Sequence, residues 1–190
     1  MKRKSFRNME CPIALALDRV GEWWSMLILR EAVHGSTRFD QFQKALGIAP
    51  NMLTRRLEAL VDSGLFERRP YSEHPPRHEY VLTERGADFW PVLVTLMAWG
   101  NKHFAPHGEV VLLADRATGK LADPKLIDKR TGAEITSERF ALAPGPKAGA
   151  RVKSKYATAS SASSERASGT LSERASGTTR SRTGSGPRPS

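Results

Sequence analysis

The feature that most constrains the fold is a change in hydrophobic period partway along the chain. Residues 50–63 repeat apolar side chains at helical spacing, whereas residues 65–71 and 78–82 alternate with a period of two. The turn between them, over 72–77, contains two consecutive prolines. A helix followed directly by a β-hairpin is therefore expected.

Helix start and stop signals place three helices before this point and one after it. Pro12 suits the first turn of a helix over 12–20 with Cys11 as its cap, and Gly21 ends it. A second helix covers 22–34, and Ser36 or Thr37 can cap a third over 38–46. The expected inward residues of these two helices are Trp23, Trp24, Leu27, Ile28, Val33, Phe39, Phe42 and Leu46. Thr83 caps a last helix to Phe104, which Pro91 either kinks or effectively starts. This order predicts a winged helix-turn-helix, a mainly α fold with a small β-hairpin wing (α+β).

Composition divides the chain into three zones. Residues 1–106 hold the dense apolar pattern and form the predicted DNA-binding and dimerisation domain. Residues 107–143 form a small β appendage with two similar turns, Asp115 to Gly119 and Asp128 to Gly132. Residues 144–190, rich in Ser, Thr, Gly and Arg with a repeated segment, are expected to be a disordered basic tail because they carry too little apolar surface to fold.

The charge distribution limits what the net charge of +10 can mean. Residues 141–190 hold 9 Lys and Arg against 2 Asp and Glu, so most of the basicity lies in the tail. The case for nucleic-acid binding must therefore rest on local placement of cations rather than on the overall charge.

The fourth helix places suitable side chains outward for reading DNA. Leu53, Leu57, Leu60 and Val61 form one inward stripe. Asn51 and Arg55 lie opposite that stripe near the helix start, with Thr54 and Arg56 at its flanks. Amide and guanidinium groups pair bidentately with adenine and guanine edges. Arg56 is equally suited to an internal ion pair, a phosphate contact or base reading.

The hairpin is suited to a wing that contacts the DNA backbone or minor groove. Its polar and aromatic residues are Arg68, Arg69, Tyr71, Ser72, His74 and Arg77, around Pro75 and Pro76. The prolines reduce the entropy lost when these side chains are ordered. Glu73 and Glu79 dilute the positive field, so the wing should position the protein more than specify sequence.

The last helix predicts a homodimer because it carries two apolar faces. Its two rows are Trp90, Leu93, Met97 and Phe104, and Phe89, Val92, Leu96 and Trp99. One face can lie on its own domain, but a domain of this size leaves the second without cover unless a partner supplies it. The alternative is a fully buried core helix.

Motifs along residues 10–104 resemble the HxlR-type regulators. They include Cys11-Pro12, the run from Met52 to Leu57, and Pro75-Pro76-Arg77-His78-Glu79-Tyr80-Val81-Leu82-Thr83 in the hairpin. The resemblance implies a dimeric winged-helix activator or repressor that inserts the fourth helix into the major groove, and a β appendage like that of some members. Ala49 departs from the serine common at the cap of that helix, and the long tail is outside the pattern. The candidate DNA-binding residues are Arg38, Asn51, Met52, Thr54, Arg55, Arg56, Arg69, Tyr71, His74 and Arg77.

Cys11 is a redox-sensing candidate. A thiol at a helix start is favoured as the thiolate by the helix dipole, and several proteins of the resembled family sense oxidants or electrophiles at this position. The alternative is an inert cap cysteine. A small-molecule effector between the second and last helices is also conceivable, although the tryptophans Trp23, Trp24, Trp90 and Trp99 can simply be packing residues.

Other function classes find little support in the sequence. The histidines at 34, 74, 78, 103 and 107 lack metal-ligand spacing, and one cysteine excludes a multi-cysteine zinc site, so no metal, cofactor or enzyme activity is expected. No apolar run is long enough for a membrane span, and a cytoplasmic, nucleoid-associated protein is expected. Two alternatives remain: a winged helix that binds only proteins, and a non-specific nucleoid protein acting through the tail.

Overall fold

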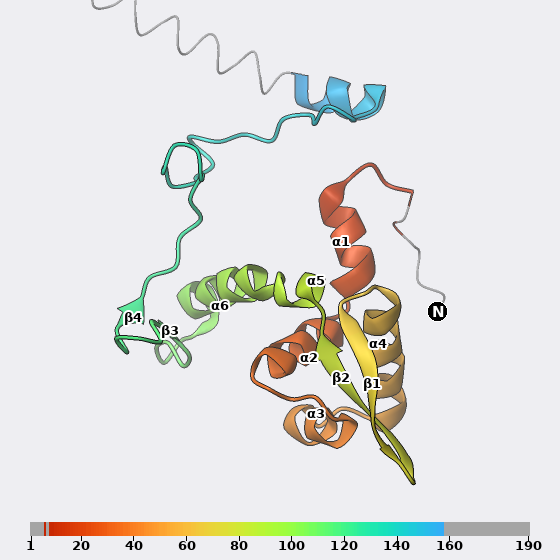
Figure 1. The fold of residues 1–190 in the computed structure, drawn as a ribbon. Coiled ribbons are helices and arrows are strands. Elements are labelled where there is room, and N and C mark those ends of the chain that lie inside the picture. Colours follow the sequence, from red (N-terminus) through yellow and green to blue (C-terminus); the bar gives the residue numbers. More distant parts are fainter. Residues whose placement is uncertain (1–5, 7, 158–190) are drawn as a thin grey trace, which may run out of the picture. The chain divides into compact units, whose positions relative to one another are not determined.

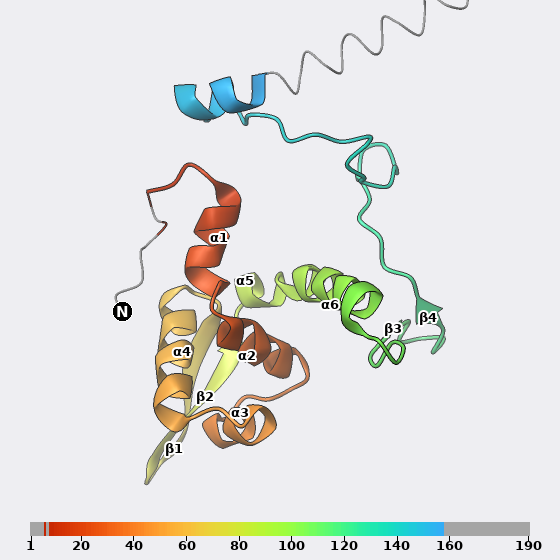
Figure 2. The ribbon, with the colours of Figure 1, turned by 180° about the vertical axis from the view of Figure 1, so that it is seen from behind.

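A computed structural model describes residue 6 and residues 8–157 of the chain. The chain divides into two compact units, Met1–Ile135 and Thr136–Ser190. The first unit contains a helical cluster with a projecting hairpin (Figure 1), and the view from behind shows the same arrangement (Figure 2). It is the winged helix-turn-helix that the sequence predicts.

Four helices precede the hairpin, close to their predicted bounds: α1 (Pro12–Val20), α2 (Trp23–Val33), α3 (Phe39–Leu46) and α4 (Pro50–Asp62). Cys11 and Ala49 are the N-cap residues of α1 and α4, and neither side chain makes a capping bond. The cap of α3 differs from the prediction. Arg38 is its N-cap residue, and Gln41 Oε1 accepts bonds from the backbone N–H groups of Thr37 (2.8 Å) and Arg38 (3.0 Å).

The core lies where α2, α3, α4 and the base of the hairpin meet. Its fully buried side chains include Ile28, Leu29, Phe42, Leu53, Leu57 and Leu60, with Phe66 from the hairpin. Phe42 and Phe66 meet edge to face with ring centroids 6.2 Å apart. The prediction that Trp23 faces inward is wrong: Trp23 is 66% exposed and stacks on Trp24, and it is Trp24 that packs against the core.

The hairpin consists of β1 (Phe66–Glu73) and β2 (Pro76–Leu82), paired antiparallel from Phe66 with Leu82 to Glu73 with Pro76. Its strands are longer than predicted, and its turn is confined to His74 and Pro75, which are joined by a cis peptide bond. The register shifts between Pro70 and Ser72. The tip of the hairpin therefore projects past the helices (Figure 1).

The single last helix that the sequence predicts is two helices, α5 (Glu84–Ala87) and α6 (Trp90–Phe104). Thr83 caps α5 as predicted by accepting a bond from the Gly86 N–H (3.1 Å). Pro91 lies in the first turn of α6, so the second of its two predicted roles is the observed one. Gly86 is buried against the backbone of Leu65: an added Cβ would lie 2.1 Å from the Leu65 carbonyl oxygen.

The appendage after α6 contains two turns of the same construction. The first joins β3 (Leu113–Ala114) to β4 (Leu121–Ala122), and the second joins Ile127 to Glu134. Asp115 Oδ1 accepts bonds from the Thr118 hydroxyl (2.8 Å) and N–H (2.7 Å). Asp128 Oδ2 accepts the same pair of bonds from Thr131, at 2.6 Å and 3.2 Å. The predicted similarity of the two turns is thus a similarity of hydrogen bonding.

In the second unit, residues 150–157 form a helix, although the sequence led us to expect disorder from residue 144 onward. Val152 and Tyr156 are half-buried and lie one helical turn apart. A short apolar pair of this kind is too small to stand out from the surrounding polar composition. The rest of the predicted tail, 158–190, lies outside the described residues. Among the described helices, none is long and apolar enough to cross a membrane.

Candidate nucleic-acid interface

The outward face of α4 begins with uncharged and cationic groups and ends with acidic ones. Asn51, Thr54 and Arg55 are exposed on its first two turns, and Glu58 and Asp62 are exposed further along. The Thr54 hydroxyl donates to the Pro50 carbonyl (3.0 Å), which holds this side chain against its own helix. Within the described residues, Arg55 makes no hydrogen bond or ion pair. Its guanidinium is therefore available to a ligand in front of the helix.

Arg56 has a different environment from its neighbour. Its guanidinium lies 3.2 Å from a carboxylate oxygen of Glu22, the N-cap residue of α2, and both side chains are largely covered. The Arg56 Nε is buried without a hydrogen-bond partner in the described structure. Of the three roles open to Arg56 from the sequence, the internal ion pair is the one that this geometry favours.

We expect Arg56→Met to lower the free energy of unfolding by about 1–2 kcal/mol, since it removes one partner of a mostly covered ion pair. The methionine keeps the aliphatic stem in place. Arg55→Met, on the exposed neighbour, should change stability by less than about 0.5 kcal/mol. Guanidinium chloride unfolding of both variants measures this difference. Equal losses in the two variants would contradict a structural role for Arg56.

The wing makes backbone contacts with the segment that precedes α3. The Tyr80 N–H donates to the Thr37 carbonyl (2.7 Å), and Arg38 forms an isolated β-bridge with Glu79. The Arg38 guanidinium also stacks over the Tyr71 ring, 4.4 Å from its centroid. Two predicted DNA-binding residues that lie far apart in the sequence are thus brought together, as a cation–π pair beside the register shift of the hairpin.

The cationic side chains of the wing differ in whether they have a partner among the described residues. Arg69 is paired with Glu67 at 2.9 Å, and this hydrogen bond lowers the pKa of the Glu67 carboxyl and raises that of Arg69. Arg68 Nη2 lies 3.0 Å from Nδ1 of His78. Arg77, next to the turn, is exposed and has no ion pair among the described residues. Arg77 is therefore the wing cation that is best placed for a phosphate.

The remaining predicted residues divide between surface and core. His74 is exposed at the tip of the wing, whereas Met52 is half-buried and packs on the core, which leaves little of it for a base edge. The site partner that the sequence analysis missed is Glu22. It lies 34 positions before Arg56, and no local pattern links an acidic helix cap to a residue on another helix.

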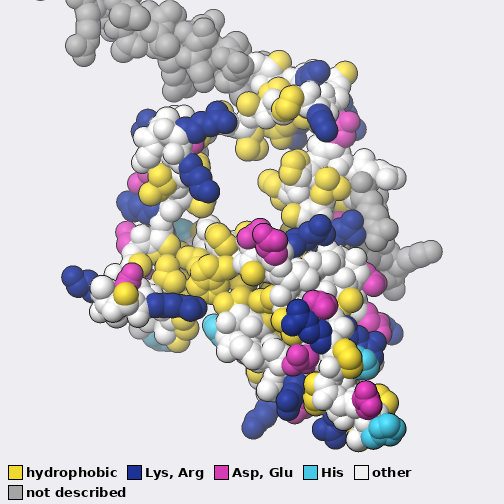
Figure 3. All heavy atoms as spheres, in the orientation of Figure 1, with side chains coloured by type: hydrophobic (Ala, Val, Ile, Leu, Met, Phe, Trp, Pro, Cys, Tyr) yellow, Lys and Arg dark blue, Asp and Glu magenta, His cyan; other side chains and the backbone are white. Residues whose placement is uncertain are grey.

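The surface around the hairpin is charged, whereas the surface over α6 is not. Side chains of Lys, Arg, Asp, Glu and His cover the hairpin, and hydrophobic side chains gather over α6 (Figure 3). Several apolar residues of α6 are 40% exposed or more: Trp90, Val92, Leu96, Trp99 and Phe104. The first unit therefore has a polar end, formed by α4 and the hairpin, and a separate apolar helix face.

Comparison with known proteins agrees with this architecture. The model of the HxlR-like helix-turn-helix family matches residues 19–108. An uncharacterised HTH-type transcriptional regulator of Mycobacterium tuberculosis is 46% identical over 135 residues, which cover 70% of this chain and 85% of that protein.

Two solved structures are similar to this chain over a longer stretch, which includes the appendage. One, described as a transcription factor from Pseudomonas aeruginosa, is 46% identical, with a TM-score of 0.57 over 76% of this chain and 99% of that chain. The other, described as the transcription factor PA1607, is 36% identical, with a TM-score of 0.67 over 75% of this chain and 100% of that chain. The fold and these likenesses show that the chain belongs to the HxlR-like helix-turn-helix family and is a transcriptional regulator, not an enzyme.

Proposed function

We propose that this regulator binds a palindromic DNA operator as a homodimer, with α4 in the major groove and the hairpin on the backbone beside it. The observation that carries the proposal is a pair of guanidinium groups with no ion pair among the described residues, Arg55 on α4 and Arg77 on the wing. Arg55 is a base reader beside Asn51, and Arg77 and His74 meet phosphates. Arg38 and Tyr71 hold the wing in place, and Arg69 adds a partly neutralised charge.

The dimer is supported by the apolar face of α6. Val92, Leu96 and Trp99 are 47%, 46% and 53% exposed, and their spacing places them on one face of the helix. Contiguous apolar surface of this kind marks an interaction site in a protein that remains dissolved. A second copy is the simplest partner, since a two-fold dimer presents two identical recognition helices to a palindrome.

We expect Val92→Glu to shift the protein from dimer to monomer, because the variant buries a carboxylate in the proposed apolar interface. Val92 lies in the first turn of α6, where an acidic residue favours the helix itself, so the fold should persist. Leu142→Glu, at a leucine that is 65% exposed in the second unit, is the matched control. Analytical ultracentrifugation measures both masses, and a Val92→Glu dimer as tight as the wild type would contradict the interface.

Selection on random duplex DNA at about 0.15 M salt tests the operator proposal, since affinity depends steeply on salt. Enrichment of an inverted repeat with half-sites about one helical turn apart, roughly 34–36 Å, is the expected result. A single unpaired half-site would overturn the palindrome. Binding without any enriched motif would instead favour the non-specific nucleoid protein, and no binding would favour a protein-interaction module.

We further propose that Cys11 makes DNA binding responsive to oxidants. It is half-exposed at the N-cap of α1, so an oxidant can reach the thiol, and its side chain makes no capping hydrogen bond that modification would have to break. Oxidant should lower operator affinity of the wild type by about ten-fold and leave Cys11→Ser unchanged. Operator titrations before and after oxidation measure this effect. Equal responses of the two proteins would show that the cysteine is an inert cap.

A further inference from the structure

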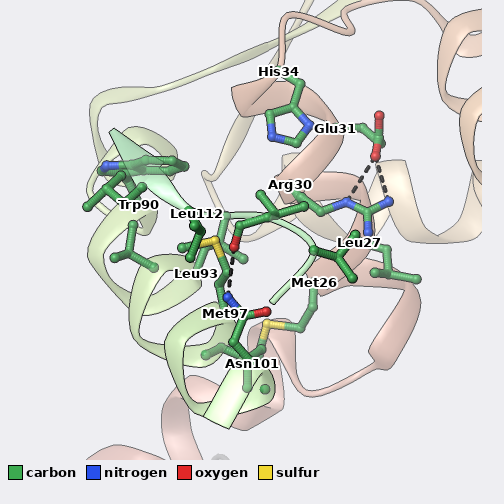
Figure 4. A pocket seen from close by; sticks show the side chains of 16 residues that line it. Met26, Leu27, Arg30, Glu31, His34, Trp90, Leu93, Met97, Asn101 and Leu112 are labelled. Atoms are coloured by element: carbon green, nitrogen blue, oxygen red, sulfur yellow. Dashed lines mark hydrogen bonds and ion pairs between the residues drawn. The ribbon is translucent and has the colours of Figure 1, made fainter. Parts of the chain in front are cut away.

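A cavity of about 600 Å³ lies between α2, α6 and the segment that follows α6. In Figure 4, Met26 and Leu27 of α2 face Trp90, Leu93 and Met97 of α6 across the cavity. Its volume falls within the range of small-molecule sites, which is about 300–1,000 Å³. The outward face of α4 takes no part in its walls, whereas Leu96 of the proposed dimer face does.

The segment 110–113 closes one side of the cavity and is tied in place. The Asn101 side-chain N–H donates to the Val111 carbonyl at 2.8 Å, so a residue of α6 holds the segment that returns over it. The chain reverses just before, at Gly108, whose φ of 98° suits glycine. The cavity is thus bounded by three segments of one unit and is preformed rather than a shallow helix face.

The chemistry of the walls favours a flat aromatic ligand. Aliphatic side chains dominate, and the sulfur atoms of Met26 and Met97 add polarisable groups that contact aromatic rings favourably. The Trp90 indole, 40% exposed, lies along the wall and offers a ring for stacking.

The ionisable groups of the cavity gather at one edge, on the last turn of α2 and its C-cap residue. Arg30 uses Nε and Nη2 to bind Glu31 Oε1, at 2.9 Å and 2.6 Å. Its Nη1 makes no hydrogen bond within the described residues. The His34 ring is exposed at the same edge and likewise makes no side-chain hydrogen bond there. Arg30 Nη1 and the His34 imidazole therefore each have the capacity to donate a hydrogen bond to a ligand acceptor at this edge.

We propose that this cavity binds a planar aromatic acid, with its ring between Met26, Met97 and Trp90 and its carboxylate at Arg30 and His34. Binding of the aromatic acid does not rest on the proposed function, but the effect of that binding on DNA affinity does. Glu22, the N-cap residue of the wall helix α2, is paired with Arg56 of α4 at 3.2 Å. A ligand that displaces α2 would therefore move the helix proposed to read DNA, and DNA and ligand affinities would be linked reciprocally.

Gly100→Leu is the sharpest test, because Gly100 lines the cavity and a Cβ there meets no atom within 4 Å. The leucine fills the space without displacing backbone, and it favours helix more than glycine does. His103→Leu adds a leucine to the same helix outside the cavity and serves as the control. Arg30→Met removes the charge, with Arg116→Met in an exposed turn as its control.

Calorimetric titration of the full chain with 2-naphthoate and with its neutral amide, 2-naphthamide, gives the readout. We expect the wild type and both controls to bind the acid with a dissociation constant below about 1 mM and to prefer it at least about five-fold over the amide. Gly100→Leu should weaken both probes about ten-fold or more, and Arg30→Met should remove only the preference for the acid.

Three outcomes would overturn the proposal. The wild type could fail to bind 2-naphthoate, Gly100→Leu could bind it unchanged, or Gly100→Leu could alter the dimer mass instead of ligand affinity. The last result would assign the cavity to the subunit interface. Because none of these readouts involves DNA, failure here is distinguishable from failure of the operator proposal.

Discussion

Arg55→Ala should remove most of the sequence preference of the protein while leaving its affinity for unrelated DNA almost unchanged. The guanidinium of Arg55 has no internal partner among the described residues, so its hydrogen bonds are available for a guanine edge. Each bidentate pair contributes about 1–3 kcal/mol of discrimination, and a dimer carries two copies. Fluorescence anisotropy titrations on the selected operator and on a scrambled duplex measure the effect.

Arg77→Ala is the matched comparison, since Arg77 is also a free arginine but lies on the wing. It should weaken binding to both duplexes by similar factors and reduce the salt slope by about one unit per subunit, as expected for loss of a phosphate contact. If Arg55→Ala weakened both duplexes equally, α4 would contact backbone rather than bases, and the assignment of the recognition helix would be wrong.

Gly86→Ala should destabilise the fold strongly. The added Cβ would lie 2.1 Å from the Leu65 carbonyl oxygen, which is backbone and belongs to the start of the hairpin. The same carbonyl accepts a bond from the Thr83 N–H at 3.1 Å, so it cannot move freely. We expect the free energy of unfolding to fall by about 3 kcal/mol, at the upper end of overpacking effects.

Gly100→Ala provides the control for this substitution. Its Cβ has open space, and alanine is favoured over glycine within a helix by roughly 0.5–1 kcal/mol, so this variant should be slightly more stable than the wild type. Guanidinium chloride unfolding compares the two. A Gly86→Ala protein as stable as the wild type would mean that the junction between hairpin and α5 yields more easily than its packing indicates.

Local sequence patterns predict most of the fold because its helices and hairpin are short and their ends are marked by glycine, proline and capping residues. The inward stripe of α4 is fully predictable, since Leu53, Leu57 and Leu60 repeat at helical spacing. The prediction for Trp23 is wrong because helical periodicity gives the direction of a side chain, but it does not show whether other residues pack against that side chain. Pro91 is the local signal for the start of α6, whereas the close approach of Gly86 to the Leu65 carbonyl, 21 residues earlier, has no local signal.

The candidate site is less predictable than the fold, since its important distinctions are tertiary. Arg55 and Arg56 are adjacent and identical in type, and only the position of Glu22 on α2 separates a free guanidinium from a paired one. The same holds for Arg38 and Tyr71, whose contact requires the hairpin to fold back on the start of α3.

The two aspartate–threonine turns of the appendage have a consequence for the conditions in which the protein stays folded. Asp115 and Thr118 are spaced like the cysteine pairs of structural zinc sites, yet each turn is closed by side-chain hydrogen bonds. Acid is the condition to which the Asp115 turn responds. The bonds from Thr118 and the Ala117 N–H lower the pKa of Asp115, so their stabilisation is present above the ordinary aspartate value and is lost as pH falls through the lowered one.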